Sequence, residues 1–236
     1  MTNAYFDLFF FGVFPYISLA VFLVMVIYRY RTREFTYSSL SSQLLENQHH
    51  FHGMVPFHYG ILAVLTGHLV AFLLPQQLLL WNLKPLRLYV LEISTFVCAL
   101  LSLFGLLNLL VRRGVSPALR KVTLLSDWIL FGMLLVQIAL GIQIAIFHPW
   151  GSSWFAASLT PYLWSLVALS PDLAFVVPMP LLVKAHIVGA FILIAYFPFT
   201  RLVHVLVAPV PYLWRKPQVV RWYGSPSNLA RGGRLP

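Results

Sequence analysis

Charged side chains are scarce in this sequence. Asp, Glu, Lys and Arg make up 9% of its 236 residues, and only 6 residues are acidic. About a quarter of an ordinary soluble domain is charged, so this composition excludes a soluble globular protein. Hydrophobic residues make up 60% of the chain. Only helices and closed barrels satisfy their backbone in lipid, and the long unbroken apolar runs favour helices.

Cysteine is also nearly absent. The single Cys98 excludes an intrachain disulfide framework, and the sequence has no Cys-x-x-Cys-His motif for covalent haem attachment. The N-terminal stretch MTNAYFDLFFF has neither a basic region nor a small-residue cleavage site. We therefore expect it to belong to a first membrane span rather than to a signal peptide.

Membrane spans can be placed by length, because a transmembrane helix needs ~20 apolar residues. The sequence predicts an all-α membrane protein, a five-transmembrane-helix bundle at residues 1–221 followed by a C-terminal cytoplasmic tail at 222–236. The apolar segments of sufficient length are 4–28, 54–80, 88–111, 124–147 and 181–207. The segment 148–180 is rich in Trp and Pro and contains no Lys or Arg. We expect it to lie at the membrane interface, where Trp and Tyr are enriched, and not to form a sixth span.

Basic residues orient the bundle. With the N-terminus outside and the C-terminus cytoplasmic, only three of the 16 Lys and Arg residues fall on the outer side, namely Lys84, Arg87 and Lys184. This arrangement satisfies the positive-inside rule. Topology explains most of the net charge of +10, so no nucleic-acid partner is expected.

Four of the 8 histidines lie within predicted spans. His58 and His68 are on the second span, and His186 and His204 are on the fifth. Antiparallel spans group them by depth into an inner pair, His58 with His204, and an outer pair, His68 with His186. Two imidazoles on facing helices are what a haem b requires, one on each face of the iron. The sequence therefore favours two stacked haem sites.

Helix geometry permits this pairing without proving it. The two histidines of the second span are ~15 Å apart and those of the fifth ~27 Å, at ~1.5 Å per residue. Eighteen residues make five whole turns, which puts His186 and His204 on one helix face, and a kink at Pro198 would reduce the mismatch in rise. Four hydrogen-bonded core histidines are the alternative. We expect surface or capping roles for the remaining ones, which are His49, His50, His52 and His148.

Several ordered motifs resemble a known family, the gamma (cytochrome b) subunit of membrane-bound respiratory nitrate reductases. They include FPYI, SSQLL, FHYGILAVLTGH, RRGVSPALR and HIVGAFILIAYFPFTRLVHVLVAPVPYL, and they extend to about Arg221. The resemblance implies a protein of the inner membrane with two haems b, proximal at His58 and His204 and distal at His68 and His186. It also implies that menaquinol or ubiquinol is oxidised on the outer side. Electrons would then pass to an iron–sulfur beta subunit and a molybdenum alpha subunit.

The same resemblance points to a quinol site beside the distal haem, at Gly67, His68 and Arg87. The family has a lysine near this place, whereas this chain has Arg87. Arginine can pair with a quinol oxygen or a haem propionate, but it cannot readily take a proton because its pKa exceeds ~12. Propionate contacts are expected from cations near the inner surface, namely Arg112, Arg113 and Arg201.

Two further polar residues have structural interpretations. We expect Asp127 to be a charge at a helix N-terminus and Gln137 to make a helix–helix hydrogen bond. The inner segments SSLSSQLLENQ and PVPYLWRKPQVVRWYG are expected to dock partner subunits. Two other functions remain open: a dihaem cytochrome b of another quinone-linked oxidoreductase, such as one acting on sulfur compounds, and a haem-free proton-coupled transporter. The transporter would need carboxylates within the spans, and the spans offer little beyond Glu92 and Asp127.

Overall fold

The computed structural model describes residues 2–32 and 50–207, and all regular structure within these ranges is helical. The chain divides into a compact unit at Met1–His204 and a second unit that begins at Val205. His49, the predicted tail at 222–236 and both predicted docking segments lie outside the described residues.

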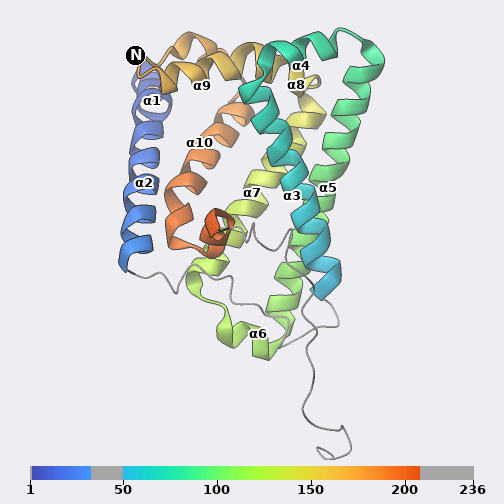
Figure 1. Cartoon of the computed structure of the whole chain (residues 1–236), viewed down its shortest axis with the longest axis vertical. Coiled ribbons are helices and arrows are strands. Elements are labelled where there is room, and N and C mark those ends of the chain that lie inside the picture. Colours follow the sequence, from blue (N-terminus) through green and yellow to red (C-terminus); the bar gives the residue numbers. More distant parts are fainter. Residues whose placement is uncertain (1, 33–49, 208–236) are drawn as a thin grey trace, which may run out of the picture. The chain divides into compact units, whose positions relative to one another are not determined.

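Five helices of the described chain are long and apolar enough to cross a membrane, as the sequence predicted. The first consists of α1 (Thr2–Asp7), a π-helical turn η1 (Leu8–Val13) and α2 (Phe14–Thr32). The other four contain α3 (His50–Leu73), α5 (Pro85–Val115), α7 (Leu125–Phe147) and α10 (Leu181–Tyr196). Figure 1 shows these long helices side by side within the first unit.

Short helices cover both ends of the long ones (Figure 1). At one end, here called the α8 end, lie α4 (Pro75–Asn82), α8 (Gly151–Trp154), the π-helix η3 (Phe155–Leu159) and α9 (Thr160–Val167). The opposite end, here called the α6 end, has α6 (Pro117–Val122). Segment 148–180 therefore contributes short helices across the α8 end, and no described helix in it is long enough to span a membrane.

Proline ends the second span earlier than the sequence analysis placed it. α3 stops at Leu73, and Pro75 starts α4 as a separate helix. Leu74 has φ −129° and ψ 53°, outside the helical region. The ring of a proline removes a backbone donor and disfavours helical geometry in the residue before it. The predicted span at 54–80 is therefore two helices.

A second proline changes the geometry of the fifth span. α10 ends at Tyr196 and is followed by two 3₁₀ helices, η5 (Phe197–Phe199) and η6 (Arg201–Val207). The side chain of Arg29 on α2 donates to the carbonyl oxygens of Pro198 (2.5 Å) and Thr200 (2.8 Å), which fixes this break. His204 consequently lies on η6, and the assumption that it shares one α-helical face with His186 was wrong.

Helices α3 and α5 approach each other closely through glycine. A Cβ atom at Gly105 would lie 2.3 Å from the backbone nitrogen of Phe57, and one at Gly60 would lie 2.6 Å from the carbonyl oxygen of Cys98. Small residues let helix backbones pack closely where lipid supplies no hydrophobic driving force. This contact holds α3, which carries His58 and His68, directly against α5.

Side chains anchor the short helices of the α8 end to the spans. The buried Tyr162 hydroxyl donates to the carbonyl oxygen of Phe11 at 2.8 Å, and the Thr160 hydroxyl donates to that of Ala71 at 3.1 Å. Glu92 on α5 accepts from the backbone N–H (2.8 Å) and the hydroxyl (2.6 Å) of Ser152. These bonds position α8, η3 and α9 over the outer pair of histidines described next.

Candidate functional site

The four candidate haem ligands come from three elements. His58 and His68 lie on α3, His186 on α10 and His204 on η6. α3 begins at the α6 end and finishes at the α8 end, whereas α10 runs in the opposite direction (Figure 1). His58 is therefore nearer the α6 end, and His68 and His186 are nearer the α8 end. The order in depth is the one that the antiparallel spans predicted.

Three of these imidazoles are oriented by backbone carbonyl groups. The Nδ1 atom lies 2.8 Å from Met54 O in His58, 2.8 Å from Val64 O in His68 and 2.6 Å from Arg201 O in His204. A carbonyl oxygen only accepts, so each bond requires the proton on Nδ1 of the neutral ring and leaves the Nε2 lone pair available. Histidines that bind metal are commonly held in this way by a hydrogen bond from the other ring nitrogen.

His186 differs from the other three. Its Nδ1 atom is buried and has no hydrogen-bond partner among the described residues. Gly141 on α7 leaves room for the ring, since a Cβ atom there would lie 3.3 Å from Cε1 of His186. A buried polar atom without a protein partner is uncommon and is explained by strain, by a bound water or ion, or by a functional role. The chemistry and the placement of His186 thus fit a haem ligand.

The space beside Gly67, which precedes His68 of the outer pair, is compatible with a planar group such as a haem. Nothing lies within 4 Å of where a Cβ atom of Gly67 would be, so this glycine is not required for packing within the described chain. The His68 ring packs edge-on against Phe155 of η3, with centroids 5.3 Å apart. A haem needs only one imidazole on each face of its iron, and the described residues contain no larger metal-binding group.

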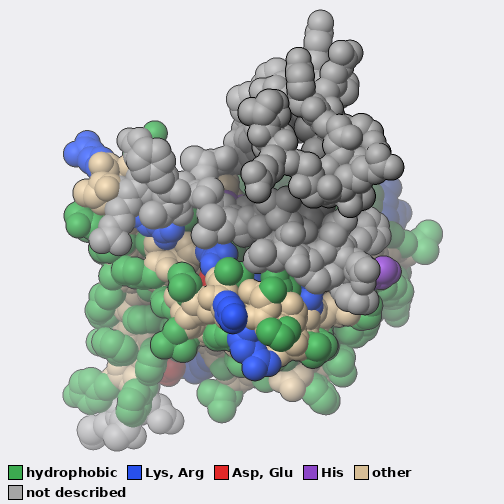
Figure 2. Space-filling view, turned by 90° about the horizontal axis from the view of Figure 1, so that it is seen from below, with side chains coloured by type: hydrophobic (Ala, Val, Ile, Leu, Met, Phe, Trp, Pro, Cys, Tyr) green, Lys and Arg blue, Asp and Glu red, His purple; other side chains and the backbone are tan. Residues whose placement is uncertain are grey.

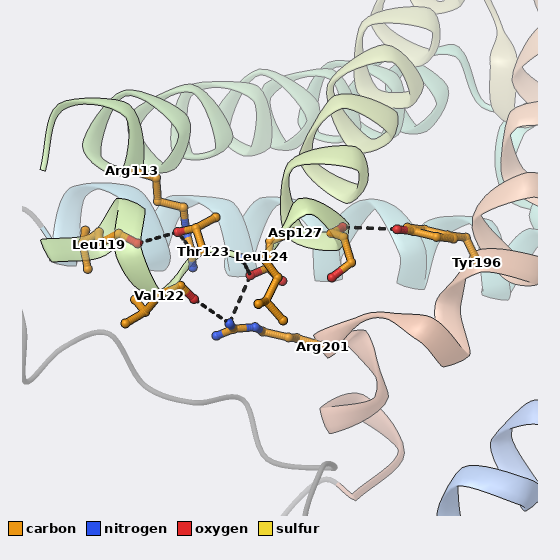
Figure 3. A network of polar contacts seen from close by, with 9 residues as sticks. Arg113, Leu119, Val122, Thr123, Leu124, Asp127, Tyr196 and Arg201 are labelled. Atoms are coloured by element: carbon orange, nitrogen blue, oxygen red, sulfur yellow. Dashed lines mark hydrogen bonds and ion pairs between the residues drawn. The ribbon is translucent and has the colours of Figure 1, made fainter. Parts of the chain in front are cut away.

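An ion pair at the α6 end joins α7 to η6 (Figure 3). Arg201 lies 3.1 Å from the Asp127 carboxylate and donates to the carbonyl oxygen of Val122 at 3.0 Å. Asp127 also accepts from the backbone N–H of Leu124 at 3.0 Å, which confirms it as a charge at the N-terminus of α7. Arg201 thus has protein partners, and its contact with a propionate stays a prediction.

The other two cations that were predicted to contact propionates lie in the last turn of α5. Arg113 donates to the Thr123 hydroxyl at 3.1 Å and lies 4.9 Å from the centre of the Phe131 ring. Arg112 is buried, with 8% of its surface exposed. Figure 2 shows Lys and Arg side chains gathered on the face of the α6 end. Their predicted role toward propionates is compatible with this location and stays a prediction.

Gln137 and Arg87 are two further polar residues whose roles were predicted from the sequence. Gln137 on α7 donates to the carbonyl oxygen of His186 at 2.9 Å, which confirms the predicted helix–helix hydrogen bond. Arg87 is exposed, and its guanidinium lies 4.9 Å from the centre of the Trp81 ring. A role of Arg87 toward quinol stays a prediction.

Sequence reasoning missed a cavity at the α8 end. A space of about 440 Å³ lies between the C-terminus of α7, η3 and the start of α10, and His148, Trp154, Ser158 and Val183 are among its lining residues. From the sequence we expected His148 to be an interfacial cap and left a functional role open. The cavity itself could not be predicted, because residues that lie far apart along the chain form it and no local motif marks it.

Comparison with known proteins supports the family resemblance that the sequence motifs indicated. The family model described as nitrate reductase gamma subunit matches residues 7–223. The chain is 33% identical over 233 residues to the respiratory nitrate reductase 2 gamma chain of Escherichia coli K12, covering 92% of this chain and 97% of that protein. It is 30% identical over 213 residues to the nitrate reductase gamma chain of Bacillus subtilis 168, covering 89% and 96% respectively.

A longer relative also matches. The nitrate reductase-like protein NarX of Mycobacterium tuberculosis H37Rv is 27% identical over 214 residues, which cover 87% of this chain and 32% of that protein. From the family match and the five long apolar helices we conclude that this chain belongs to the nitrate reductase gamma subunit family, the membrane-anchored cytochrome b subunits of these oxidoreductases.

Proposed function

We propose that this chain is the dihaem subunit of a respiratory nitrate reductase that oxidises quinol on the outer side of the membrane. Electrons pass through two haems b to a cytoplasmic iron–sulfur subunit and on to nitrate at a molybdenum subunit. The proposal rests on the hydrogen bonding of the ring nitrogens in the four histidines. In three of them Nδ1 bonds to a backbone carbonyl oxygen and Nε2 has no hydrogen-bond partner among the described residues, and in the fourth the buried Nδ1 atom has no partner within the same part of the chain. The relatives named above are nitrate reductase chains, which favours nitrate over sulfur compounds.

Each pair of histidines holds one haem in this proposal. His68 and His186 hold the distal haem, and His58 and His204 hold the proximal one. When bound, a haem supplies one-electron transfer at its iron. The hydrogen bonds to Met54, Val64 and Arg201 O keep three rings in the tautomer that can bind metal.

Basic residues give the bundle its orientation in this proposal. The α6 end, with Arg29 and Arg31 of α2, Arg112 and Arg113 of α5 and the basic residues of α6, faces the cytoplasm. The iron–sulfur subunit docks there, and the guanidinium groups offer positive charge to proximal propionates. Quinol binds at the opposite end beside Gly67 and His68, where Arg87 donates a hydrogen bond to a quinol oxygen but keeps its own proton.

The structure does not favour the transporter alternative, because the carboxylates that it would use are committed within the protein. Asp127 pairs with Arg201, and Glu92 accepts two hydrogen bonds from Ser152. A relay of protons needs groups that are free to change partners.

Haem counting tests the proposal. We expect purified full-length protein to contain two haems b by pyridine haemochrome, and His58→Ala and His68→Ala variants to retain one each. His52→Ala, at an exposed histidine of α3, is the matched control and should retain both. Folded wild-type protein without haem, despite adequate haem supply during expression, would overturn the proposal.

A further inference from the structure

The inner candidate ligand His204 follows a break in the helical hydrogen bonding of the fifth span. In an α-helix that continued past Pro198, the N–H of Leu202 would donate to the carbonyl oxygen of Pro198. Here the N–H of Leu202 donates to the hydroxyl oxygen of Thr200 at 3.1 Å, and this hydroxyl donates to the carbonyl oxygen of Phe197 at 2.8 Å. Thr200 is buried, with 2% of its surface exposed, and its backbone is extended (φ −112°, ψ 178°). Thr200 therefore forms a hinge between η5 and η6.

The first span supplies a partner for carbonyl groups of this hinge. In the last turn of α2, Nη1 of Arg29 donates to the carbonyl oxygen of Pro198 at 2.5 Å and to that of Thr200 at 2.8 Å. Phe22, about two turns earlier on α2, packs edge-on against Phe197 of η5, with ring centroids 5.4 Å apart. A buried carbonyl group without a partner costs free energy, so Arg29 stabilises the hinge in this conformation. Arg29 thus joins the first span, which carries no candidate haem ligand, to the hinge.

His204 is oriented by the peptide unit next to this attachment. Its Nδ1 atom lies 2.6 Å from the carbonyl oxygen of Arg201, the residue after Thr200. The side chain of Arg201 pairs with Asp127 at 3.1 Å and donates to the carbonyl oxygen of Val122 at 3.0 Å. α2 therefore holds the chain at Thr200, and α6 and α7 hold it at the following residue. The direction of the Arg201 carbonyl bond, and with it the orientation of the imidazole, depends on both attachments.

We propose that Arg29 and Thr200 are positioning residues for the inner haem, which fix the orientation of His204 and thereby the reduction potential at the iron. This inference rests on the proposed function, in which His204 is a ligand of that haem. An imidazole whose Nδ1–H donates to a carbonyl oxygen is a more basic ligand, and a more basic ligand favours the oxidised iron. Loosening of the hinge weakens this hydrogen bond, so the inner haem becomes easier to reduce.

Redox titration with low-temperature electron paramagnetic resonance tests the role of Thr200. The full-length haem-containing chain is used, and the inner haem is identified by its absence from His204→Ala. Thr200→Val keeps the shape of the side chain without its hydroxyl, whereas Thr200→Ser keeps the hydroxyl. We expect Thr200→Val to shift the inner haem at least tenfold toward the reduced form, which is ~59 mV for one electron, and to change its resonance signal. Thr200→Ser should stay within twofold of wild type, and the outer haem should be unchanged in both variants.

Arg29 is tested by a substitution that keeps its charge. The side chain in Arg29→Lys is one bond shorter and lacks the planar guanidinium group, so we expect the loss of at least one bond to the hinge. The inner haem should shift in the same direction as in Thr200→Val, and the outer haem should stay constant. Arg31→Lys, at an exposed arginine in the same turn of α2, is the matched control and should change neither reduction equilibrium by more than twofold.

Haem content and potentials together decide the outcome. Loss of the inner haem alone from Thr200→Val or Arg29→Lys would support the inference as a shift of its potential does. If both haems keep their potentials and signals in these variants, or are lost together, the hinge only stabilises the fold and the inference is overturned, while the proposed function stands on a wild type with two haems. If His204→Ala retains both haems, His204 is not a ligand, and the proposed function fails together with the inference.

Discussion

Gln137 of α7 holds the backbone of α10 at a candidate haem ligand, with its Nε2 atom 2.9 Å from the carbonyl oxygen of His186. A Cβ atom at Gly189 would lie 2.4 Å from the Oε1 atom of the same side chain. The two helices therefore meet closely one turn from His186. Gly141, on the same helix as Gln137, makes room for the imidazole. α7 thus positions both the backbone and the ring of this histidine.

Removal of the Gln137 hydrogen bond tests this positioning. We expect Gln137→Leu to lower the free energy of unfolding by roughly 0.5–2 kcal/mol, because hydrogen bonds between membrane helices contribute in this range. The midpoint potential of the outer haem should shift, while that of the inner haem stays constant. Thermal unfolding in detergent and a redox titration measure the two effects. Gln143→Leu, at an exposed glutamine of the same helix, is the control and should change neither.

Close packing of α3 on α5 depends on Gly105. We expect Gly105→Ala to destabilise the protein by about 1–3 kcal/mol or more, because the methyl group would collide with the backbone of Phe57 rather than with a movable side chain. His58 follows Phe57, so the inner haem should be lost first, as counted by pyridine haemochrome. Gly114→Ala meets nothing within 4 Å and should be neutral or slightly stabilising. Equal effects of the two substitutions would contradict the close approach.

The Asp127–Arg201 ion pair connects α7 to η6. We expect Asp127→Ala to cost about 1–3 kcal/mol, because it removes the buried carboxylate that pairs with Arg201, while the partly exposed Arg201 keeps its hydrogen bond to Val122 O. Arg201→Met in the same background should recover part of this loss. A double-mutant cycle on thermal or denaturant unfolding measures the coupling free energy. Simple additivity of the two substitutions would show that the pair does not interact.

The ionisation of Tyr162 is expected to make the stability of the protein depend on pH in the alkaline range. Burial, with a smaller contribution from the nearby Tyr16, raises the pKa of Tyr162 above its ordinary value. The unfolded chain therefore loses this phenolic proton before the folded one does. The contribution of the neutral Tyr162 side chain to the free energy of unfolding is therefore fully present below pH ~10 and is lost as the pH rises above this value. We expect unfolding temperatures measured from pH 8 to 11 to fall less steeply for Tyr162→Phe than for wild type; parallel curves would exclude the linkage.

Membrane orientation is tested by reporter fusions. We expect a fluorescent protein fused to the C-terminus to fold and fluoresce and alkaline phosphatase at the same place to be inactive, because the positive-inside rule puts the α6 end in the cytoplasm. Phosphatase activity at the C-terminus would reverse the orientation and with it the side on which quinol is oxidised.

Local patterns in the sequence predicted much of this protein. Runs of about 20 apolar residues determine five long helices, since such runs are too long and too continuous for the strands of a barrel, the other structure that satisfies its backbone in lipid. The order of His58, His68 and His186 in depth follows from span direction alone. The structural role of Gln137 was also predictable, because a lone amide within a span needs a partner.

Tertiary structure decided the features that depend on contacts between distant segments. Pro75 and Pro198 were visible in the sequence, but the packing of α4 over the bundle and the bonds from Arg29 to Pro198 and Thr200 determine where each span ends. The unpartnered Nδ1 atom of His186 and the cavity at His148 are likewise properties of three-dimensional packing. Periodicity specifies which face of a helix is apolar, whereas the position of a side chain relative to another helix depends on how the helices pack.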